Sequence, residues 1–357
     1  MGTNPKRADL VFEGGGVKGI GLAGAFWELD RQGWSPERVA GTSAGAITAA
    51  LVAVGYRGDD LKRILLEEME FPKFADGGGG LLAGGLEMLR HKGLHKGEYF
   101  LDWMRQRLEK KKITTFGQLR THDTSDDLTR RYRLQVIASD VSLSRMLVLP
   151  ADAHYLGVEP DELEIADAVR MSMSIPIFFD PVVRRNPASG NEHVVVDGGM
   201  LSNFPVWLFD TKDGQRPRWP TFGMLLVAPS QRHPLGPGPE AEGHDEGDLN
   251  IVQYLSAIAH TAMEAHDRLY VERANYARTI PIQTCGVGTT QFDISPALAG
   301  QLFDAGRQGA ADFLKTWDFA AYTAAFRAGE PQPSRRQVVV ERMRASKPSD
   351  DGEAQHA

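Results

Sequence analysis

The segment VAGTSAGAIT, Val39 to Thr48, places one serine between two glycines. Gly41 lies two residues before Ser43 and Gly45 two residues after it, in a G-x-S-x-G pattern. The short apolar segment before the serine is typical of a strand, and the long apolar segment after it is typical of a helix. The pattern predicts a nucleophile elbow, a tight strand-to-helix turn that needs small flanking residues because larger side chains would collide across it.

An elbow of this kind presents a hydroxyl at the start of a helix. We therefore expect Ser43 to be exposed and to act as a nucleophile. A serine hydroxyl is a poor nucleophile at neutral pH unless a base accepts its proton and hydrogen-bond donors stabilise the oxyanion. The structural alternative is a turn that only packs a helix against a sheet.

A second turn, Gly14-Gly15-Gly16, follows the predicted strand DLVFE and precedes another helical segment. Consecutive glycines leave backbone N–H groups accessible, which favours an oxyanion hole. Together with Gly19 the turn also fits a dinucleotide fingerprint, but that fingerprint expects a carboxylate at the end of the next strand, and none is present. Lys18 is followed by glycine, so the segment is not a Walker A loop either.

A third turn, Asp197-Gly198-Gly199, follows the apolar segment HVVV. We expect a carboxylate at the carboxyl end of a strand to lie at the same edge of the sheet as the elbow. Asp197 can then be the base itself or the residue that orients a histidine base, and an Asp that caps its own turn is the structural alternative. The candidate histidines, His260 and His266, lie on a predicted long helix without any motif, so a Ser–Asp dyad is the simpler interpretation.

Composition excludes several other classes of protein. A net charge of −7 in 357 residues argues against a sequence-independent nucleic-acid binder, which needs clustered Lys and Arg. Cys285 is the single cysteine, so no intramolecular disulfide or Cys-rich metal site can form, and we expect this thiol to be buried. We expect no metal and no cofactor. Without a signal-peptide pattern or an apolar run of transmembrane length, the sequence predicts a cytoplasmic protein, with export without a cleaved signal left open.

The alternation of strands, tight turns and helices predicts a parallel or mixed sheet covered by helices. We expect an N-terminal tail at 1–8, one α/β domain at 9–316 and a largely disordered tail at 317–357. Inside the domain, the glycine-rich segment 72–95 is interpreted as a lid and the segment 230–249 as a polar loop.

The segments GGGVKG, GTSAG and DGG, in this order and each at a predicted strand end, resemble the patatin-like phospholipase family. The resemblance extends to SMSIPIFFDPV and NFPV and covers Asp9 to Leu314. It implies a three-layer α/β/α sandwich with a mainly parallel central sheet, and cleavage of fatty-acyl esters by a Ser–Asp dyad. It further implies that Ser43 is the nucleophile, that Asp197 is the base, that the three consecutive glycines form the oxyanion hole, and that Lys18 supports the oxyanion or a phosphate.

The function expected from this resemblance is a serine lipid acyl hydrolase of the phospholipase A or lysophospholipase kind. The alternatives are an acyltransferase or deacylase with the same dyad and, in another class, a non-catalytic lipid- or nucleotide-binding module. We expect a phospholipid or other acyl-lipid substrate and peripheral contact with a membrane, and the sequence does not determine the oligomeric state. Two sets of apolar residues are candidates for a substrate groove, the second of which is more simply interpreted as core: Leu81, Leu82, Leu86, Met88 and Leu89, and Met171, Met173, Ile175, Ile177 and Phe178.

Overall fold

The computed structural model describes residues 6–74, 93–125, 127–211, 216–228, 258, 261 and 273–327. Its strands are β1 (Lys6–Phe12), β2 (Trp34–Thr42), β3 (Gly93–His95), β4 (Leu134–Asp140), β5 (Arg145–Leu149), β6 (Ile177–Phe179), β7 (Val182–Arg185), β8 (Glu192–Asp197), β9 (Thr221–Val227) and β10 (Thr279–Gln283). Its helices are α1 (Ile20–Arg31), α2 (Ala44–Ala53), α3 (Gly58–Arg63), α5 (Glu98–Lys111), α6 (Leu128–Arg131), α7 (Ile165–Ser172), α9 (Arg273–Tyr276), α10 (Pro296–Thr316) and α11 (Phe319–Phe326).

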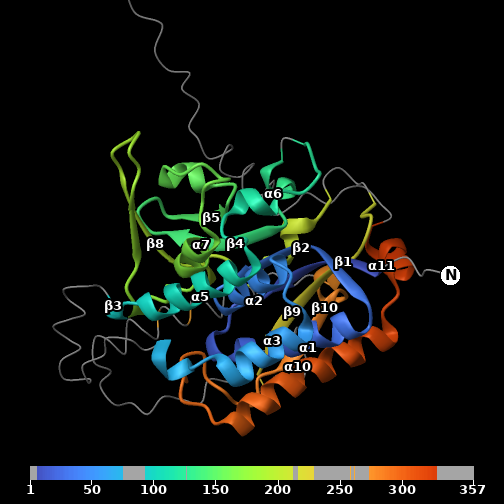
Figure 1. Cartoon of the computed structure of the whole chain (residues 1–357). Helices are drawn as coiled ribbons and strands as arrows, with labels where there is room; N and C mark the ends of the chain where they lie inside the picture. Colours follow the sequence, from blue (N-terminus) through green and yellow to red (C-terminus); the bar gives the residue numbers. More distant parts are fainter. Residues whose placement is uncertain are drawn as a thin grey trace, which may run out of the picture.

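The centre of the molecule is an 8-stranded mixed sheet with the order β10-β9-β1-β2-β4-β8-β7, in which β5 also pairs with β4 (Figure 1). The strands β10, β9, β1, β2 and β4 run parallel to one another. β5 and β8 are antiparallel to β4, and β7 is antiparallel to β8. The structure therefore confirms the predicted α/β fold with a central sheet, and it adds an antiparallel edge.

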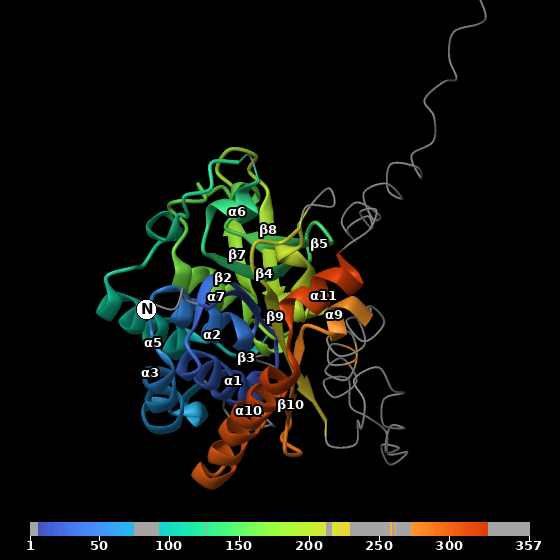
Figure 2. The same ribbon diagram turned by 90° about the vertical axis from the view of Figure 1, so that its right-hand side faces the viewer.

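The two faces of the sheet are covered differently. Alternate residues of each strand face opposite sides, so Leu10 and Phe12 join the large core beneath the helices while Val11 joins a smaller cluster. α1, α3 and α10 lie side by side in both views of this layer (Figure 1, Figure 2). Among the described residues, the smaller cluster is covered by the segment around the 3-10 helix Val206–Phe209 rather than by a complete layer of helices.

Most of the predicted elements are present, with shifts of a few residues at their ends. β6 and β7 are not predicted from the sequence, because both are short and Pro181 lies between them. Met171, Met173 and Ile175 are buried in the large core, as the simpler interpretation predicted.

Two predicted boundaries need correction. Lys6 already begins β1, and Ala8 is fully buried and pairs with Pro36, so residues 6–8 belong to the sheet instead of a tail. The first residues of the predicted C-terminal tail form α11, because Trp317 packs against Phe222 with ring centroids 5.2 Å apart and so holds the chain on the domain. Only residues up to 327 of that predicted tail are described.

Several other predictions concern residues outside the described ranges. The predicted lid is described only at 72–74, where Phe74 is buried, and at 93–95 in β3. The polar loop 230–249 and most of the predicted long helix, with His260 and His266, lie outside. The prediction for Cys285 is wrong: the thiol is exposed, because it lies in a turn after β10 with a left-handed backbone (φ 51°). No helix in the described part of the chain is long and apolar enough to cross a membrane.

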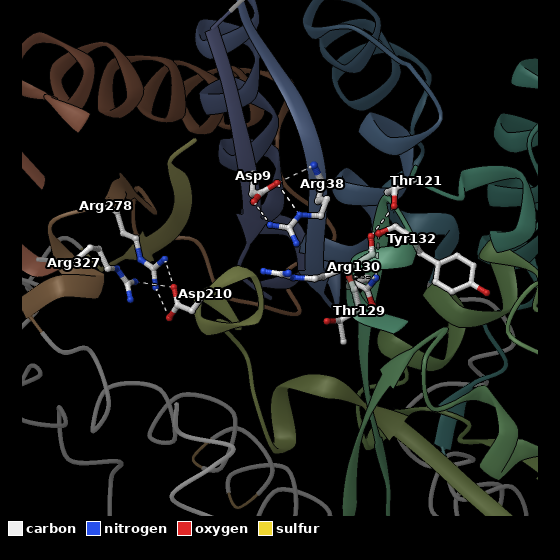
Figure 3. Close-up of polar contacts among 10 residues, drawn as sticks. Asp9, Arg38, Thr121, Thr129, Arg130, Tyr132, Asp210, Arg278 and Arg327 are labelled. Atoms are coloured by element: carbon white, nitrogen blue, oxygen red, sulfur yellow. Dashed lines mark hydrogen bonds and ion pairs between the residues drawn. The ribbon is translucent and has the colours of Figure 1, made fainter. Parts of the chain in front are cut away.

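A partly buried ion cluster ties the last described helix, α11, to the amino end of the sheet. The carboxylate of Asp210 lies between two guanidinium groups, 2.6 Å from Arg278 and 2.8 Å from Arg327 (Figure 3). Arg278 is only 2% exposed. Removing the Arg278 charge from water costs free energy, and the interaction with a carboxylate compensates this cost.

We expect Asp210→Ala to lower the free energy of unfolding by about 3–5 kcal/mol, because the substitution leaves the buried Arg278 without its carboxylate partner and with the neutral Asn275 side chain as acceptor. Urea denaturation measures this quantity. The matched control is Asp304→Ala, which breaks a surface pair with Arg307 in which Asp304 is 68% exposed, and its expected cost is below about 1 kcal/mol. Equal losses in the two variants would show that the Asp210 cluster does not stabilise the fold.

Candidate active site

The predicted elbow is present at the junction of β2 and α2. Ser43 has φ 53° and ψ −126°, an unusual backbone for a residue other than glycine. The flanking glycines are sterically required: a Cβ at Gly45 would stand 2.3 Å from the carbonyl oxygen of Phe12, and a Cβ at Gly41 would stand 2.3 Å from that of Gly45. The strain that a nucleophile elbow requires is therefore found at the predicted serine.

Ser43 is not exposed as the sequence analysis predicted, because it is only 1% accessible to solvent. The glycine loop lies against it: a Cβ at Gly14 would stand 3.1 Å from the Ser43 Cβ. The end of α7 also contacts it, since the backbone N–H of Ser43 donates a 2.9 Å hydrogen bond to Ser172 Oγ. The hydroxyl therefore lies in an enclosed environment, in which electrostatic interactions are stronger than in water.

Asp197 lies beside the elbow, but not for the reason given by the sequence analysis. β8 runs antiparallel to β4, so its carboxyl end points away from the edge at which β2 ends. The two residues meet because β4 extends beyond β2. Thr42 pairs with Ile137, and the next residue of β4, Ala138, pairs with Asp197. β8 therefore runs back along the part of β4 that extends beyond β2, and its last residue, Asp197, lies level with Ser43.

The carboxylate of Asp197 is fully buried and only half partnered. Its Oδ1 accepts a 2.7 Å hydrogen bond from the Gly199 N–H, while Oδ2 has no partner within ordinary hydrogen-bond geometry. Burial raises the pKa of Asp197 to about 7, although the Ser43 side chain and the Gly199 amide each lower it as hydrogen-bond partners. The contact with Ser43 is therefore longer or less well aligned than an ordinary hydrogen bond, as is common in catalytic pairs without substrate.

The Asp-Gly-Gly turn is shaped by its surroundings. A Cβ at Gly198 would stand 2.2 Å from the carbonyl oxygen of Ile137, so a side chain there would displace β4. The Gly199 amide supplies the hydrogen bond to Asp197 described above. Both glycines therefore help to fix the carboxylate.

The glycine loop supplies fewer donors than predicted. The Gly14 N–H donates a 3.1 Å hydrogen bond to the backbone oxygen of Asn203, so the prediction that Gly14 contributes to the oxyanion hole fails in this arrangement. Among the described residues, the amides of Gly15 and Gly16 have no acceptor. Gly16 has φ +57°, and a Cβ there would stand 1.9 Å from the Thr289 oxygen, which only glycine tolerates. The partly buried Lys18 folds over the loop, with its Cε 3.6 Å from the position of a Gly15 Cβ.

Sequence reasoning missed several groups that surround the pair. The first amide of α2, at Ala44, directly follows the elbow serine, and its position in the motif could have identified it as a donor. Asn203 holds the glycine loop, since its Nδ2 donates to the Gly14 oxygen at 3.1 Å and to Glu13 Oε1 at 3.3 Å. Glu13 Oε2 in turn accepts the Leu226 N–H at 2.5 Å. The segment NFPV was the only sequence signal for this network.

The histidine alternative concerned His260 and His266, which lie outside the described residues. The described histidine nearest in sequence to Asp197 has another partner. His193 lies on the same strand, but its Nδ1 is 2.7 Å from Asp140 Oδ2 in a separate buried pair. In the part of the chain that the structure describes, no group of three or more His, Cys, Asp or Glu side chains is arranged to hold a metal ion.

The site combines a strained serine turn, a glycine loop and an Asp-Gly-Gly turn, side by side on an α/β sheet. This combination is typical of hydrolases. The sequence model of patatin-like phospholipases matches residues 10–210. This chain belongs to the patatin-like phospholipase family, whose members are lipid hydrolases.

Two kinds of comparison accompany this assignment. The chain is 36% identical over 317 residues to the uncharacterized protein YqhO of Bacillus subtilis (strain 168), covering 87% of this chain and 99% of YqhO. Among solved structures it is similar to VipD from Legionella pneumophila, with 19% identity, a TM-score of 0.49 and coverage of 88% of this chain and 68% of VipD. The similarity to ExoU of Pseudomonas aeruginosa has 17% identity, a TM-score of 0.46 and coverage of 88% and 52%.

Proposed function

We propose that this protein is a serine lipid acyl hydrolase of the phospholipase A or lysophospholipase kind. Ser43 is the nucleophile and Asp197 is the base. The observation that carries the proposal is the buried Asp197 carboxylate, which has one oxygen held by Gly199 and the other without an ordinary partner beside Ser43. A raised pKa near neutrality suits a general base, because it combines ionisation with affinity for the proton.

In the acylation half of the proposed reaction, Ser43 Oγ attacks the acyl carbonyl carbon while Asp197 accepts the hydroxyl proton. The negative charge that develops on the carbonyl oxygen is stabilised by the amides of Gly15, Gly16 and Ala44, which lie at the loop and at the positive end of α2. Collapse of the intermediate breaks the ester bond, and Asp197 returns the proton to the leaving alcohol. An acyl-enzyme on Ser43 remains.

In the second half, Asp197 accepts a proton from water as the water oxygen attacks the acyl carbonyl. The bond to Ser43 Oγ breaks, the proton passes to that oxygen, and a free fatty acid leaves. Both halves need the same carboxylate in its ionised form. The same chemistry with an alcohol or thiol in place of water would give an acyltransferase.

Release of fatty acid from phosphatidylcholine and lysophosphatidylcholine vesicles tests the substrate class. We expect release by the wild type and none above background by Ser43→Ala. Addition of a soluble alcohol distinguishes the two reactions, because a transferase would form the new ester at the expense of the free acid. Vesicle binding without release in either protein would instead identify a non-catalytic lipid-binding module.

The pH dependence of the reaction follows from the state of Asp197. The base is protonated and inactive below the pKa of about 7, and ionised above it. We therefore expect kcat/KM to rise about tenfold per pH unit below pH 7 and to level off above it. Hydrolysis of a neutral p-nitrophenyl ester between pH 5 and 9 measures this profile. A profile that is flat across this range would exclude Asp197 as the base.

A further inference from the structure

The carboxyl end of α7 contacts both members of the proposed catalytic pair. Ser172, the last residue of α7, accepts the Ser43 N–H at 2.9 Å through its Oγ. The same hydroxyl donates a 2.6 Å hydrogen bond to the carbonyl oxygen of Ile137. Two residues further on, the backbone oxygen of Ser174 accepts the Asp197 N–H at 2.9 Å.

These contacts join the elements that carry the two functional side chains. Ser172 connects the elbow to β4 at Ile137, and the residue that follows Ile137 pairs with Asp197 in the sheet. Ser172 is fully buried, and its hydroxyl donates one hydrogen bond and accepts one. A side chain with no hydroxyl would leave a buried N–H on Ser43 and a buried carbonyl on Ile137 without partners.

The end of α7 is itself held in place. Arg170 is buried, with 6% of its surface exposed, and its Nη1 donates to Ser174 Oγ at 2.5 Å. Its Nη2 donates to the backbone oxygens of Lys96 at 2.5 Å and Asp180 at 3.0 Å. Ser172 and Ser174 at the end of α7 are thus held by the residues that directly follow β3 and β6 as well as by the central sheet.

The backbone of Ser43 is the part of the site that most needs such support. Its positive φ is costly for a residue with a side chain, and such strain persists only where the surroundings determine it. The hydrogen bond from Ser172 acts directly on the strained residue. On the proposed function above, we infer that Ser172 is a positioning residue that sets the distance and direction of the Ser43 hydroxyl relative to Asp197.

Steady-state kinetics of Ser172→Ala tests this inference. We expect kcat to fall about 100-fold, the loss typical of a reacting group displaced by about 1 Å, with KM within about threefold of the wild type. The midpoint of the pH profile should also move upward, because the Ser43 side chain lowers the pKa of Asp197 and would move away from it. The control is Thr279→Val, which removes a buried hydroxyl that donates a 2.7 Å hydrogen bond to the backbone oxygen of Asn275. Thr279 lies at the amino end of β10, whereas Ser43 follows the carboxyl end of the parallel strand β2. The control should stay within about threefold in kcat with an unchanged midpoint.

If Ser172→Ala does not fold, Ser172→Cys keeps the shape of the side chain with a weaker donor and acceptor, and should lose at least about tenfold in kcat. Wild-type kcat in a folded Ser172 variant would overturn the inference. It would also be overturned if Ser172→Ala left the pH midpoint unchanged and lowered kcat and Tm only as much as Thr279→Val does. Full activity in Ser43→Ala would overturn the proposed function itself. Loss in Ser43→Ala with wild-type activity in Ser172→Ala would overturn only the positioning role.

Discussion

Ser43→Ala is expected to lower kcat for ester hydrolysis by about 10⁴- to 10⁶-fold, because no other group replaces the attacking oxygen. The residual rate would come from the oxyanion donors and from substrate binding alone. The substitution removes a single oxygen atom from a buried position, and alanine adopts the same backbone at no greater cost. Ser43→Ala should therefore be folded, with a Tm close to that of the wild type.

The chain offers a matched control for this variant. Ser144 is the other described serine with a positive φ, 50° against 53° for Ser43, and it lies in the turn between β4 and β5. Ser144→Ala makes the same chemical change at a residue that also has a positive φ, away from the proposed site, and should retain wild-type kcat. Comparable losses in the two variants would mean that the loss in Ser43→Ala does not arise from the missing Ser43 hydroxyl.

Asp197→Asn is the second change with a large expected effect. An amide cannot accept the Ser43 proton, so we expect a loss of about 10⁴-fold or more in kcat, similar to that found when an acid partner of a serine nucleophile is neutralised. The Gly199 hydrogen bond can be kept by the amide oxygen. The effect on kcat should therefore arise from the lost base rather than from a displaced turn.

The stability of Asp197→Asn should change in the opposite direction from its activity. Because the folded pKa of about 7 lies above the ordinary value of 3.8, folded wild type binds a proton that the unfolded chain has lost. Wild-type stability therefore falls as the pH rises from about 4 to about 7, and the amide lacks this dependence. We expect the stability of Asp197→Asn relative to the wild type to increase as the pH rises from about 4 to about 7, and the variant to be the more stable protein above pH 7.

Asp140→Asn provides the opposite case. Asp140 is also fully buried, but it is bonded to His193 and to the amides of Ser142 and Leu143. We expect this variant to keep most of its activity and to lose stability. Denaturation at pH 5 and pH 8, with kcat measured on the same samples, separates the two residues. Loss of stability in Asp197→Asn at pH 8 would show that the carboxylate is a structural group.

The elbow could be predicted from sequence because its geometry leaves small residues at fixed spacing around Ser43. The proximity of Asp197 was predicted correctly on a wrong assumption about strand direction. The antiparallel course of β8 depends on pairing with a distant part of the chain, and no local pattern encodes it. In the same way, the Gly14 amide looked available in the sequence, but its acceptor is a backbone oxygen at residue 203.

The groups that surround the pair were hardest to predict. Ser172 and Asn203 lie far from Ser43 in the sequence, and each contributes one hydrogen bond or a few that only the folded chain reveals. Their sequence signals were the segments SMSIPIFFDPV and NFPV, which carried the family resemblance without indicating what the side chains contact. The burial of Ser43 was missed for the same reason, since it results from packing between three distant segments.

The central claim is that Ser43 is a nucleophile activated by Asp197, and covalent labelling tests it most directly. A fluorophosphonate should add once to the wild type, and mass spectrometry of the digested protein should place the adduct on Ser43. We expect no adduct with Ser43→Ala and much slower labelling of Asp197→Asn at pH 8. Stoichiometric labelling of Ser43→Ala, or an active enzyme that forms no adduct at Ser43, would contradict the account.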